Sequence, residues 1–271
     1  MDLVSQHALS RHSPPYWWRL IATALSFALF GIGGVALRVL IFPLLALLPG
    51  DALVHRRRAR ATVSRLFYLF VQFMYRSGVL TYEVEGAERL GQPGQMVIAN
   101  HPSLIDVVAL IAFIRDANCV VKQSLWDNPC MRGPIRAAGY ISNSGSLDML
   151  DEAAGALREG QTLIVFPEGT RTTPGQPPRF HRGAAAIALR GARILTPVVI
   201  SASPTTLTKA EPWYRIPSRR FHLRLRVGED LDPAAFARLG PAPVASRKLN
   251  DHLHQYFMKE LAEDERSATR D

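Results

Sequence analysis

Two polar residues close together in the sequence, His101 and Asp106, could carry acid–base chemistry. They follow an apolar run at 96–99, typical of a buried strand, and Asp106 lies within an apolar helical pattern at 104–114. The proline after His101 cannot extend the strand and the serine after it is a good N-cap, so His101 should lie in the turn. A carboxylate that holds a histidine fixes its tautomer and stabilises the imidazolium, which favours a general base.

The same residues also fit a structural motif. Ser103 and Asp106 have the spacing of a capping box, in which the Asp106 carboxylate turns back to the backbone of Ser103. The spacing alone leaves catalysis and capping open. The catalytic interpretation therefore depends on a second motif further along the chain.

The second motif follows another apolar run, at 162–166, and has the sequence Pro-Glu-Gly-Thr-Arg at 167–171. In open α/β sheets ligands collect outside the carboxyl ends of strands, so two parallel strands would bring both motifs to one edge. Arg171 offers a planar fork for a phosphate, Thr170 offers a hydroxyl, and Gly169 lets the backbone approach a ligand closely. Taken alone, the segment is also an ordinary β-turn.

Together the two motifs resemble the glycerolipid acyltransferase family (lysophosphatidic acid acyltransferase-like enzymes). Asn-His-x₄-Asp, beginning at Asn100, and Phe-Pro-Glu-Gly-Thr-Arg, beginning at Phe166, carry a resemblance that covers residues 80–205. Lys122 and the block at 180–185 are supporting matches.

The resemblance implies acyl transfer from a thioester, either acyl-CoA or acyl-carrier protein, to a hydroxyl of a lysophospholipid-like acceptor such as 1-acylglycerol-3-phosphate. His101 would take the hydroxyl proton as general base, and Asp106 would orient the imidazole. The acceptor would be bound by the residues of the second motif, namely Glu168, Gly169, Thr170 and Arg171. No cofactor, metal or covalent enzyme intermediate is implied. Backbone N–H groups at the start of the helix from residue 104 are candidate oxyanion donors.

One departure from the family pattern concerns the acceptor. Many members close a Gly-x₅-Arg block with an arginine used on the acceptor phosphate, whereas the corresponding stretch, 139–145, ends in Gly145. Arg132 and Arg136 lie just upstream and are either compensating accessory residues, like Asn100 and Lys122, or ordinary surface arginines. A non-phosphate acceptor such as a lyso-aminolipid or glycolipid stays open. An acyl-thioester hydrolase that uses the same His–Asp pair, or a non-enzymatic lipid-binding protein, also stays open.

The amino-terminal segment is typical of a helical membrane anchor. An uncharged apolar run at 20–37 resumes after Arg38 and continues to 49, which is nearly long enough to span a bilayer. One straight helix would place Arg38 in hydrocarbon, so we expect a hairpin or a bend that lets Arg38 reach headgroups; a span and a re-entrant anchor both stay open. The basic cluster at 55–60 would bind anionic headgroups and predicts that the active domain lies on the cytoplasmic face of the inner membrane.

From residue 79 the pattern changes to alternating strands and helices. Strands are expected at 80–84, 96–99, 119–121, 162–166, 196–201 and 221–227, and helices at 104–114, 147–158, 183–190 and 245–263. This predicts an α/β fold with a mixed, largely parallel sheet covered by helices and an N-terminal helical membrane-anchoring module. Apolar and basic residues alternate at 221–227, which predicts a half-exposed edge strand. We expect a flexible lead-in at 1–16, the anchor at 17–78 and the acyltransferase domain at 79–271.

Composition narrows the class of partner. The 271 residues are 48% hydrophobic and 20% charged, with a formal net charge of +9. A basic surface fits nucleic acid, an anionic membrane or a phosphorylated substrate, but no zinc spacing or RNP-type motif is present, so nucleic acid is not expected. Cys119 and Cys130 lack ligand or disulfide spacing, so we expect free thiols and no metal site. The stretch 172–182 is expected to be a loop that gates the site.

Overall fold

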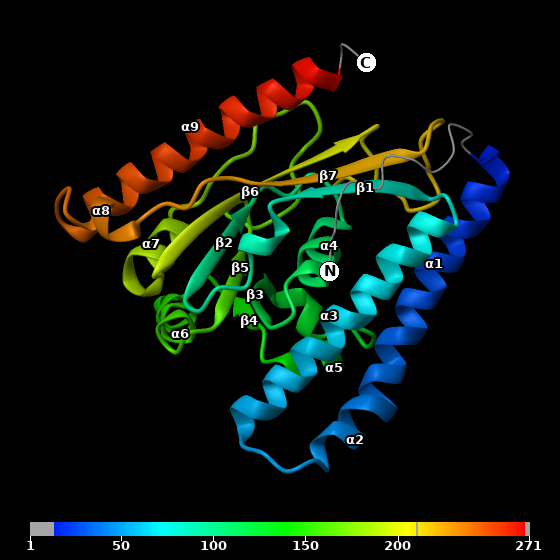
Figure 1. Ribbon diagram of the computed structural model, residues 1–271, viewed down its shortest axis with the longest axis horizontal. Helices are drawn as coiled ribbons and strands as arrows, with labels where there is room; N and C mark the ends of the chain where they lie inside the picture. The colour runs from blue at the N-terminus through cyan, green and yellow to red at the C-terminus, as the bar shows by residue number, and fades with distance from the viewer. Residues whose placement is uncertain (1–13, 210, 269–271) are drawn as a thin grey trace.

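The computed structural model describes residues 14–209 and 211–268. Most of the predicted lead-in lies outside these residues. The described strands form a single seven-stranded sheet in the order β1-β7-β6-β2-β5-β3-β4 (Figure 1). Their bounds are β1 (Leu80–Glu85), β2 (Gln95–Ala99), β3 (Ala117–Lys122), β4 (Ile141–Asn143), β5 (Thr162–Val165), β6 (Ile194–Ser203) and β7 (Phe221–Val227). Every neighbouring pair is parallel except β6 and β7, which confirms the predicted mixed, largely parallel sheet.

Helices cover both faces of this sheet, as Figure 1 shows. Their bounds are α1 (Tyr16–Ala36), α2 (Phe42–Ala46), α3 (Ala52–Arg76), α4 (Asp106–Phe113), α5 (Arg132–Ala138), α6 (Leu147–Arg158), α7 (Arg182–Gly191), α8 (Pro233–Ala237) and α9 (Ala242–Ala268). Short 3₁₀ turns lie at Ala87–Arg89 and Gln123–Trp126. Helices α3, α4 and α5 share one apolar core with the sheet, and α6, α7 and α9 share the other.

The position of strand β2 in the sheet explains the uninterrupted apolar run at 96–99. Val97 and Ala99 belong to the core on the α4 face, and Met96 and Ile98 belong to the core on the α6 face. All four side chains are fully buried. A central strand between two helical layers has no solvent face, so it shows an uninterrupted apolar run rather than an alternating one.

The prediction that 221–227 forms an edge strand is wrong. Strand β7 pairs with β1 on one side and with β6 on the other. Its basic side chains reach acidic partners instead of bulk water: Arg224 donates to Glu85 of β1 at 2.6 Å, and Arg226 donates to Asp264 of α9 at 3.0 Å. Ion pairing beneath a covering helix therefore produced the same alternation of charge that an exposed edge would show.

The amino-terminal helices form a hairpin, but its turn lies after residue 46 and not near Arg38, where the sequence had suggested a hairpin or a bend. Helix α1 continues through a π-helical turn (Leu37–Ile41) into α2, and α3 returns alongside (Figure 1). Arg38 lies in the π-helical turn, where its Nη1 donates to the carbonyl oxygen of Pro129 at 3.4 Å. The backbone of Gly133 lies so close that a Cβ added there would be 2.5 Å from Cβ of Arg38. Arg38 thus contacts the protein body while its side chain remains exposed, and its contact with lipid headgroups stays a prediction.

The side chains of α1 are distributed in the opposite way to those of a helix in a water-soluble protein. The buried side includes the polar residues Arg19, Thr23 and Ser26. The Arg19 guanidinium donates to the carbonyl oxygens of Pro217 and Ser218, which precede β7. Because polar groups point inward and bond to the protein, the apolar side chains of α1 are left to face outward.

The outward face of this helix is long and apolar. The face continues through the π-helical turn and α2, and its exposed large side chains are Trp17, Trp18, Ile21, Leu25, Leu29, Ile32, Val35, Val39, Leu40, Leu44 and Leu47. Among the described residues, Tyr16–Ala46 is the one helical stretch whose length and composition would allow it to cross a membrane, with 22% of its most apolar window buried. An exposed apolar face of this extent marks a contact with lipid or with another apolar surface.

Gly34 provides a test of how α1 packs. A Cβ at position 34 would lie 2.5 Å from the carbonyl oxygen of Cys130, whereas a Cβ at Gly33 would meet nothing within 4 Å. We expect Gly34→Val to lower the free energy of unfolding by about 1–3 kcal/mol through overpacking. Gly33→Val, the matched control in the same helix, should change it by less than about 0.5 kcal/mol. Thermal unfolding in detergent measures both; equal stability of the two variants would contradict the packing of α1 against this backbone.

Candidate active site

The two sequence motifs meet at the carboxyl edge of the sheet. Strands β2 and β5 are parallel neighbours, with Ile98 opposite Val165. The first motif continues from the end of β2 and the second from the end of β5, so both turns leave the sheet on the same edge. The backbone joins them directly, because Thr172 N–H donates to the carbonyl oxygen of His101 at 2.8 Å. The predicted meeting of the motifs is therefore confirmed.

Asp106 makes both of the contacts that the sequence left as alternatives. Its Oδ2 lies 3.0 Å from Nδ1 of His101 and accepts the backbone N–H of Ser103 at 2.7 Å. Helix α4 begins at Asp106 rather than at 104, and Ser103 does not cap it with its side chain. One carboxylate oxygen thus shapes the turn and orients the imidazole, which leaves Nε2 as the accepting nitrogen of the neutral ring.

The surroundings of the pair are largely dry. The Asp106 side chain is fully buried and that of His101 is 14% exposed. Burial raises the pKa of Asp106, while the hydrogen bond from His101 acts in the opposite direction. The imidazole is also packed against the ring of Phe166, with 4.5 Å between centroids. The ring is therefore fixed from two sides, by a carboxylate and by an aromatic face.

Glu168 supports the turn that contains His101. Its Oε1 accepts the backbone N–H of His101 at 2.8 Å, and both of its oxygens accept the Thr172 hydroxyl, at 2.9 and 2.8 Å. Burial raises the pKa of Glu168, and these hydrogen bonds oppose that rise. The predicted contact between Glu168 and the acceptor gains no support from this geometry, since both oxygens are already bonded within the protein.

Arg171 belongs to a second set of contacts that closes the site. Its Nη1 donates to the carbonyl oxygens of Leu207, at 2.8 Å, and Thr208, at 2.9 Å. The Leu207 carbonyl also accepts the backbone N–H of Leu104 at 3.2 Å. Leu207 has a φ of +53°, an uncommon conformation for a bulky side chain. This carbonyl links both motifs to the segment after β6, and no sequence pattern pointed to it.

These contacts bear on the expected oxyanion donors, which stay a prediction. The N–H of Ser103 donates to Asp106, and the N–H of Leu104 donates to Leu207. Two of the N–H groups at the predicted helix start are therefore already used, because the helix begins later than the pattern suggested.

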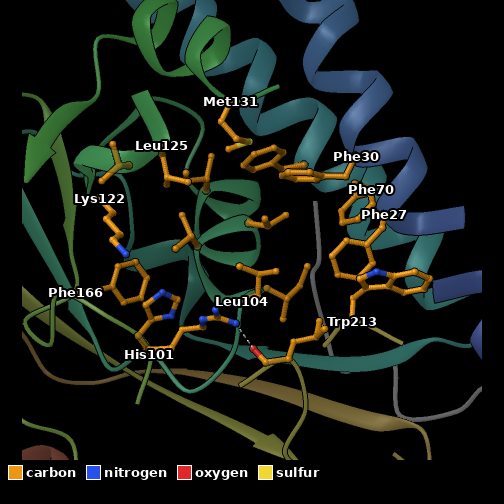
Figure 2. Close-up of a pocket in the computed structure, with 18 of the residues that line it drawn as sticks. Phe27, Phe30, Phe70, His101, Leu104, Lys122, Leu125, Met131, Phe166 and Trp213 are labelled. Carbon is orange, nitrogen blue, oxygen red and sulfur yellow. Dashed lines mark hydrogen bonds between the residues drawn. The ribbon is translucent and has the colours of Figure 1, made fainter. Parts of the chain in front are cut away.

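The His–Asp pair adjoins a cavity of about 500 Å³, a volume within the range of roughly 300–1,000 Å³ for ligand sites. Its lining is mostly apolar and aromatic. Figure 2 shows two groups of side chains in it: His101, Phe166 and Lys122 on one side, and Phe27, Phe30, Phe70 and Trp213 beside the amino-terminal helices on the other. Trp213 packs against Phe27 in a tilted arrangement, with 5.6 Å between centroids. The cavity thus extends from His101 to the helical hairpin.

The charged groups of this lining all have the same sign. They are Arg19, Lys122 and Arg171, and no Asp or Glu is found among the described residues that line it. Such a lining favours an anionic group on the ligand.

The other predicted site residues occupy different positions. Gly169 and Thr170 line the cavity, as does Lys122, whose side chain extends toward Phe166 and His101 in Figure 2. Asn100 instead bridges β2 to β6: its amide donates to the Ile200 carbonyl at 2.7 Å and accepts the Ile200 N–H at 2.8 Å.

The structure does not bring the α5 arginines, Arg132 and Arg136, to the lining. Elements β4 and α5 are absent from the sequence prediction. The strand is only Ile141–Asn143, and the helix contains glycine and proline, so neither has a readable period. Asn143, at the end of β4, lines the cavity; it lies in the stretch 139–145 discussed above, but the sequence analysis assigned it no role.

The two cysteines are free, as predicted. Cys119 lines the cavity, and burial raises the pKa of its thiol to about 12. It is therefore protonated at neutral pH and is not a nucleophile. Within the described residues, no three His, Cys, Asp or Glu side chains gather where they could hold a metal ion. The stretch 172–181 is irregular, as expected for a loop, and its gating role stays a prediction.

Comparison with known proteins agrees with the geometry. A family model described as Acyltransferase matches residues 81–201. A 1-acyl-sn-glycerol-3-phosphate acyltransferase of Pseudomonas aeruginosa is 24% identical over 190 residues, which cover 68% of this chain and 70% of that protein. The 1-acyl-sn-glycerol-3-phosphate acyltransferase alpha of Mus musculus is 26% identical over 190 residues, 66% of this chain and 65% of that protein.

A solved structure shows a similar fold. The 1-acyl-sn-glycerophosphate acyltransferase PlsC from Thermotoga maritima superimposes with a TM-score of 0.72 at 21% identity, over 91% of this chain and 96% of that one. At this identity the likeness concerns the fold. The family model, the sequence relatives and the two motifs support an acyltransferase of the lysophosphatidic acid acyltransferase-like family.

Proposed function

We propose that this protein transfers a fatty acyl group from a thioester to a hydroxyl of an anionic lysolipid at a membrane surface. The observation that carries the proposal is the His101–Asp106 pair beside a cavity. The lining of this cavity is mostly apolar, and its charged side chains are all cationic. An apolar wall suits an acyl chain, and cations near a general base suit an acceptor with an anionic headgroup.

His101 acts as the general base in this proposal. As the acceptor hydroxyl oxygen attacks the thioester carbonyl carbon, Nε2 takes the hydroxyl proton. Asp106 stabilises the imidazolium that forms, through the contact at Nδ1. When the tetrahedral intermediate collapses, the carbon–sulfur bond breaks and the imidazolium returns the proton to the leaving sulfur. No cofactor, metal or covalent enzyme intermediate enters these steps.

The acceptor headgroup is held by Arg171 and Lys122 in this proposal, with Gly169 and Thr170 beside them. Arg171 uses Nη1 on two carbonyl groups, which fixes its guanidinium and leaves Nε and Nη2 to donate to an anion. We assign Glu168 a positioning role, because its carboxylate holds the backbone of His101. A 1-acylglycerol-3-phosphate fits this donor set. Acyl-CoA and acyl-carrier protein both fit as donors.

The amino-terminal hairpin is the proposed membrane contact. Its outward face is apolar, as described above, and α3 begins with the basic residues at 56–58, which suit anionic headgroups. Arg19 and Arg38 tie α1 and the π-helical turn to the protein body. A helix held along its length in this way would lie in one leaflet rather than cross the bilayer. Because basic residues favour the anionic cytoplasmic leaflet, the cytoplasmic face is the proposed side.

The proposal is tested by supplying purified protein in phospholipid vesicles with a labelled acyl thioester, with and without 1-acylglycerol-3-phosphate. We expect the diacyl product to form and thioester consumption to depend on the acceptor. Release of free fatty acid at the same rate without the acceptor would instead establish a thioesterase. Absence of both reactions, with acyl-CoA and with acyl-carrier protein, would contradict an acyltransferase function for these substrates.

A further inference from the structure

We propose that Asn143 is a specificity-determining residue, whose side-chain amide donates a hydrogen bond to the anionic headgroup of the acceptor. This inference rests on the proposed acyl transfer to an anionic lysolipid and deepens it. It concerns a phosphate or a carboxylate, because both anions present oxygen acceptors to the same donors.

Strand pairing places Asn143 beside a cation of the site. Strands β3 and β4 are parallel, and their last register pair is Lys122 with Asn143. Residues paired in this way lie about 4.8 Å apart and direct their side chains to the same face of the sheet. Both residues line the cavity next to the catalytic pair. An anion held by Lys122 is therefore within reach of the Asn143 amide.

The backbone of the second motif approaches Asn143 closely. A Cβ built on Gly169 would lie 3.6 Å from Nδ2 of Asn143 and 3.8 Å from Cδ2 of His181. Gly169 has a φ of +64°, which favours glycine. A ligand that contacts the Gly169 backbone would thus be in contact with the amide as well, on the side of the turn that also contains Arg171.

The hydrogen-bonding capacity of this amide is unused. Within the described part of the chain, the Asn143 side chain has no hydrogen-bond partner, although its backbone is paired with β3 and its neighbour Ser144 bonds to Ser146. The amide is exposed to the cavity rather than committed to a cap or a turn. It is neutral, so it adds a donor to the cationic lining without adding a carboxylate that would repel an anion.

Two substitutions that keep a side chain of similar size test the role of the amide itself. Asn143→Leu removes the hydrogen bond, and Asn143→Asp replaces the donor with a carboxylate next to Lys122. We expect the KM for an anionic acceptor to rise about tenfold in Asn143→Leu and further in Asn143→Asp. The kcat and the KM for the acyl thioester should be unchanged, because the proposed hydrogen bond binds the acceptor equally in the ground state and in the transition state. Ser144→Asp is the matched control, because it adds the same charge one residue away, outside the lining.

The assay uses three acceptors in mixed micelles: 1-acylglycerol-3-phosphate, a lysolipid whose headgroup anion is a carboxylate, and uncharged monoacylglycerol. A rise in KM confined to one anionic acceptor supports the proposal and identifies the anion; a rise for both also supports it. Given that the wild-type protein transfers acyl groups, three results would overturn the proposal. The KM for monoacylglycerol rises as much as the KM for the anionic acceptors, or no KM changes. The third is that Ser144→Asp raises the KM for the anionic acceptors as much as Asn143→Asp does. If the wild-type protein transfers to no acceptor, the proposed function fails first and this inference fails with it.

Discussion

Replacing His101 with glutamine is expected to lower the kcat of acyl transfer by about 10²–10⁴-fold, the usual contribution of a general base. Asp106 engages Nδ1 at 3.0 Å, so Nε2 is the nitrogen that takes the acceptor proton. A glutamine amide can still donate to Asp106 but contains no basic nitrogen. The fold and the acceptor site should therefore persist while the chemical step is lost. Initial rates with a labelled thioester and saturating acceptor measure the effect.

Another histidine of the same chain serves as the control. His252 is exposed on α9 and packs against Phe236, away from the cavity. We expect His252→Gln to retain wild-type transfer, and both glutamine variants to retain the wild-type thermal midpoint. A rate for His101→Gln within about threefold of wild type, far below the contribution of a general base, would contradict the assignment.

Replacing Asp106 with asparagine is expected to lower the rate by at least about 10²-fold without weakening the fold. The Oδ2 atom accepts both hydrogen bonds of the side chain, from Ser103 and His101, whereas Oδ1 is buried without a partner. An asparagine with its oxygen in the place of Oδ2 keeps both hydrogen bonds. What it removes is the negative charge that stabilises the imidazolium in the transition state.

The pKa of Asp106 gives this variant a second signature. Burial raises that pKa, so the folded protein binds the carboxyl proton at a higher pH than the unfolded chain does. Above the raised pKa, the ionised carboxylate costs stability, and this cost disappears as the pH falls through it. At a pH above that raised pKa, Asp106→Asn should therefore unfold at the same temperature as wild type or higher. A variant that loses rate and stability together would show that Asp106 is mainly a structural residue.

Much of the fold could be predicted because the central strands are continuous apolar runs separated by polar turns. Strands β2, β5 and β6 are buried on both faces, so their apolar runs stand out from the flanking turns. Strand β7 was placed wrongly for a physical reason: its Arg224 and Arg226 pair with acidic groups of β1 and α9. A sequence pattern reports that a face is polar, and it does not report whether water or an ion pair satisfies that face.

The candidate groups for the chemistry could be named from the sequence. His101, Asp106 and Arg171 lie in short motifs that follow recognisable strands, and the pair of motifs with its family resemblance pointed to them where spacing alone left alternatives open. Only the tertiary structure decided what surrounds them: the Leu207 carbonyl between both motifs, the polar inner side of α1, and Asn143 beside the pocket's lysine. These contacts join segments far apart in the chain, and packing and hydrogen bonding fix them only once all the layers are assembled.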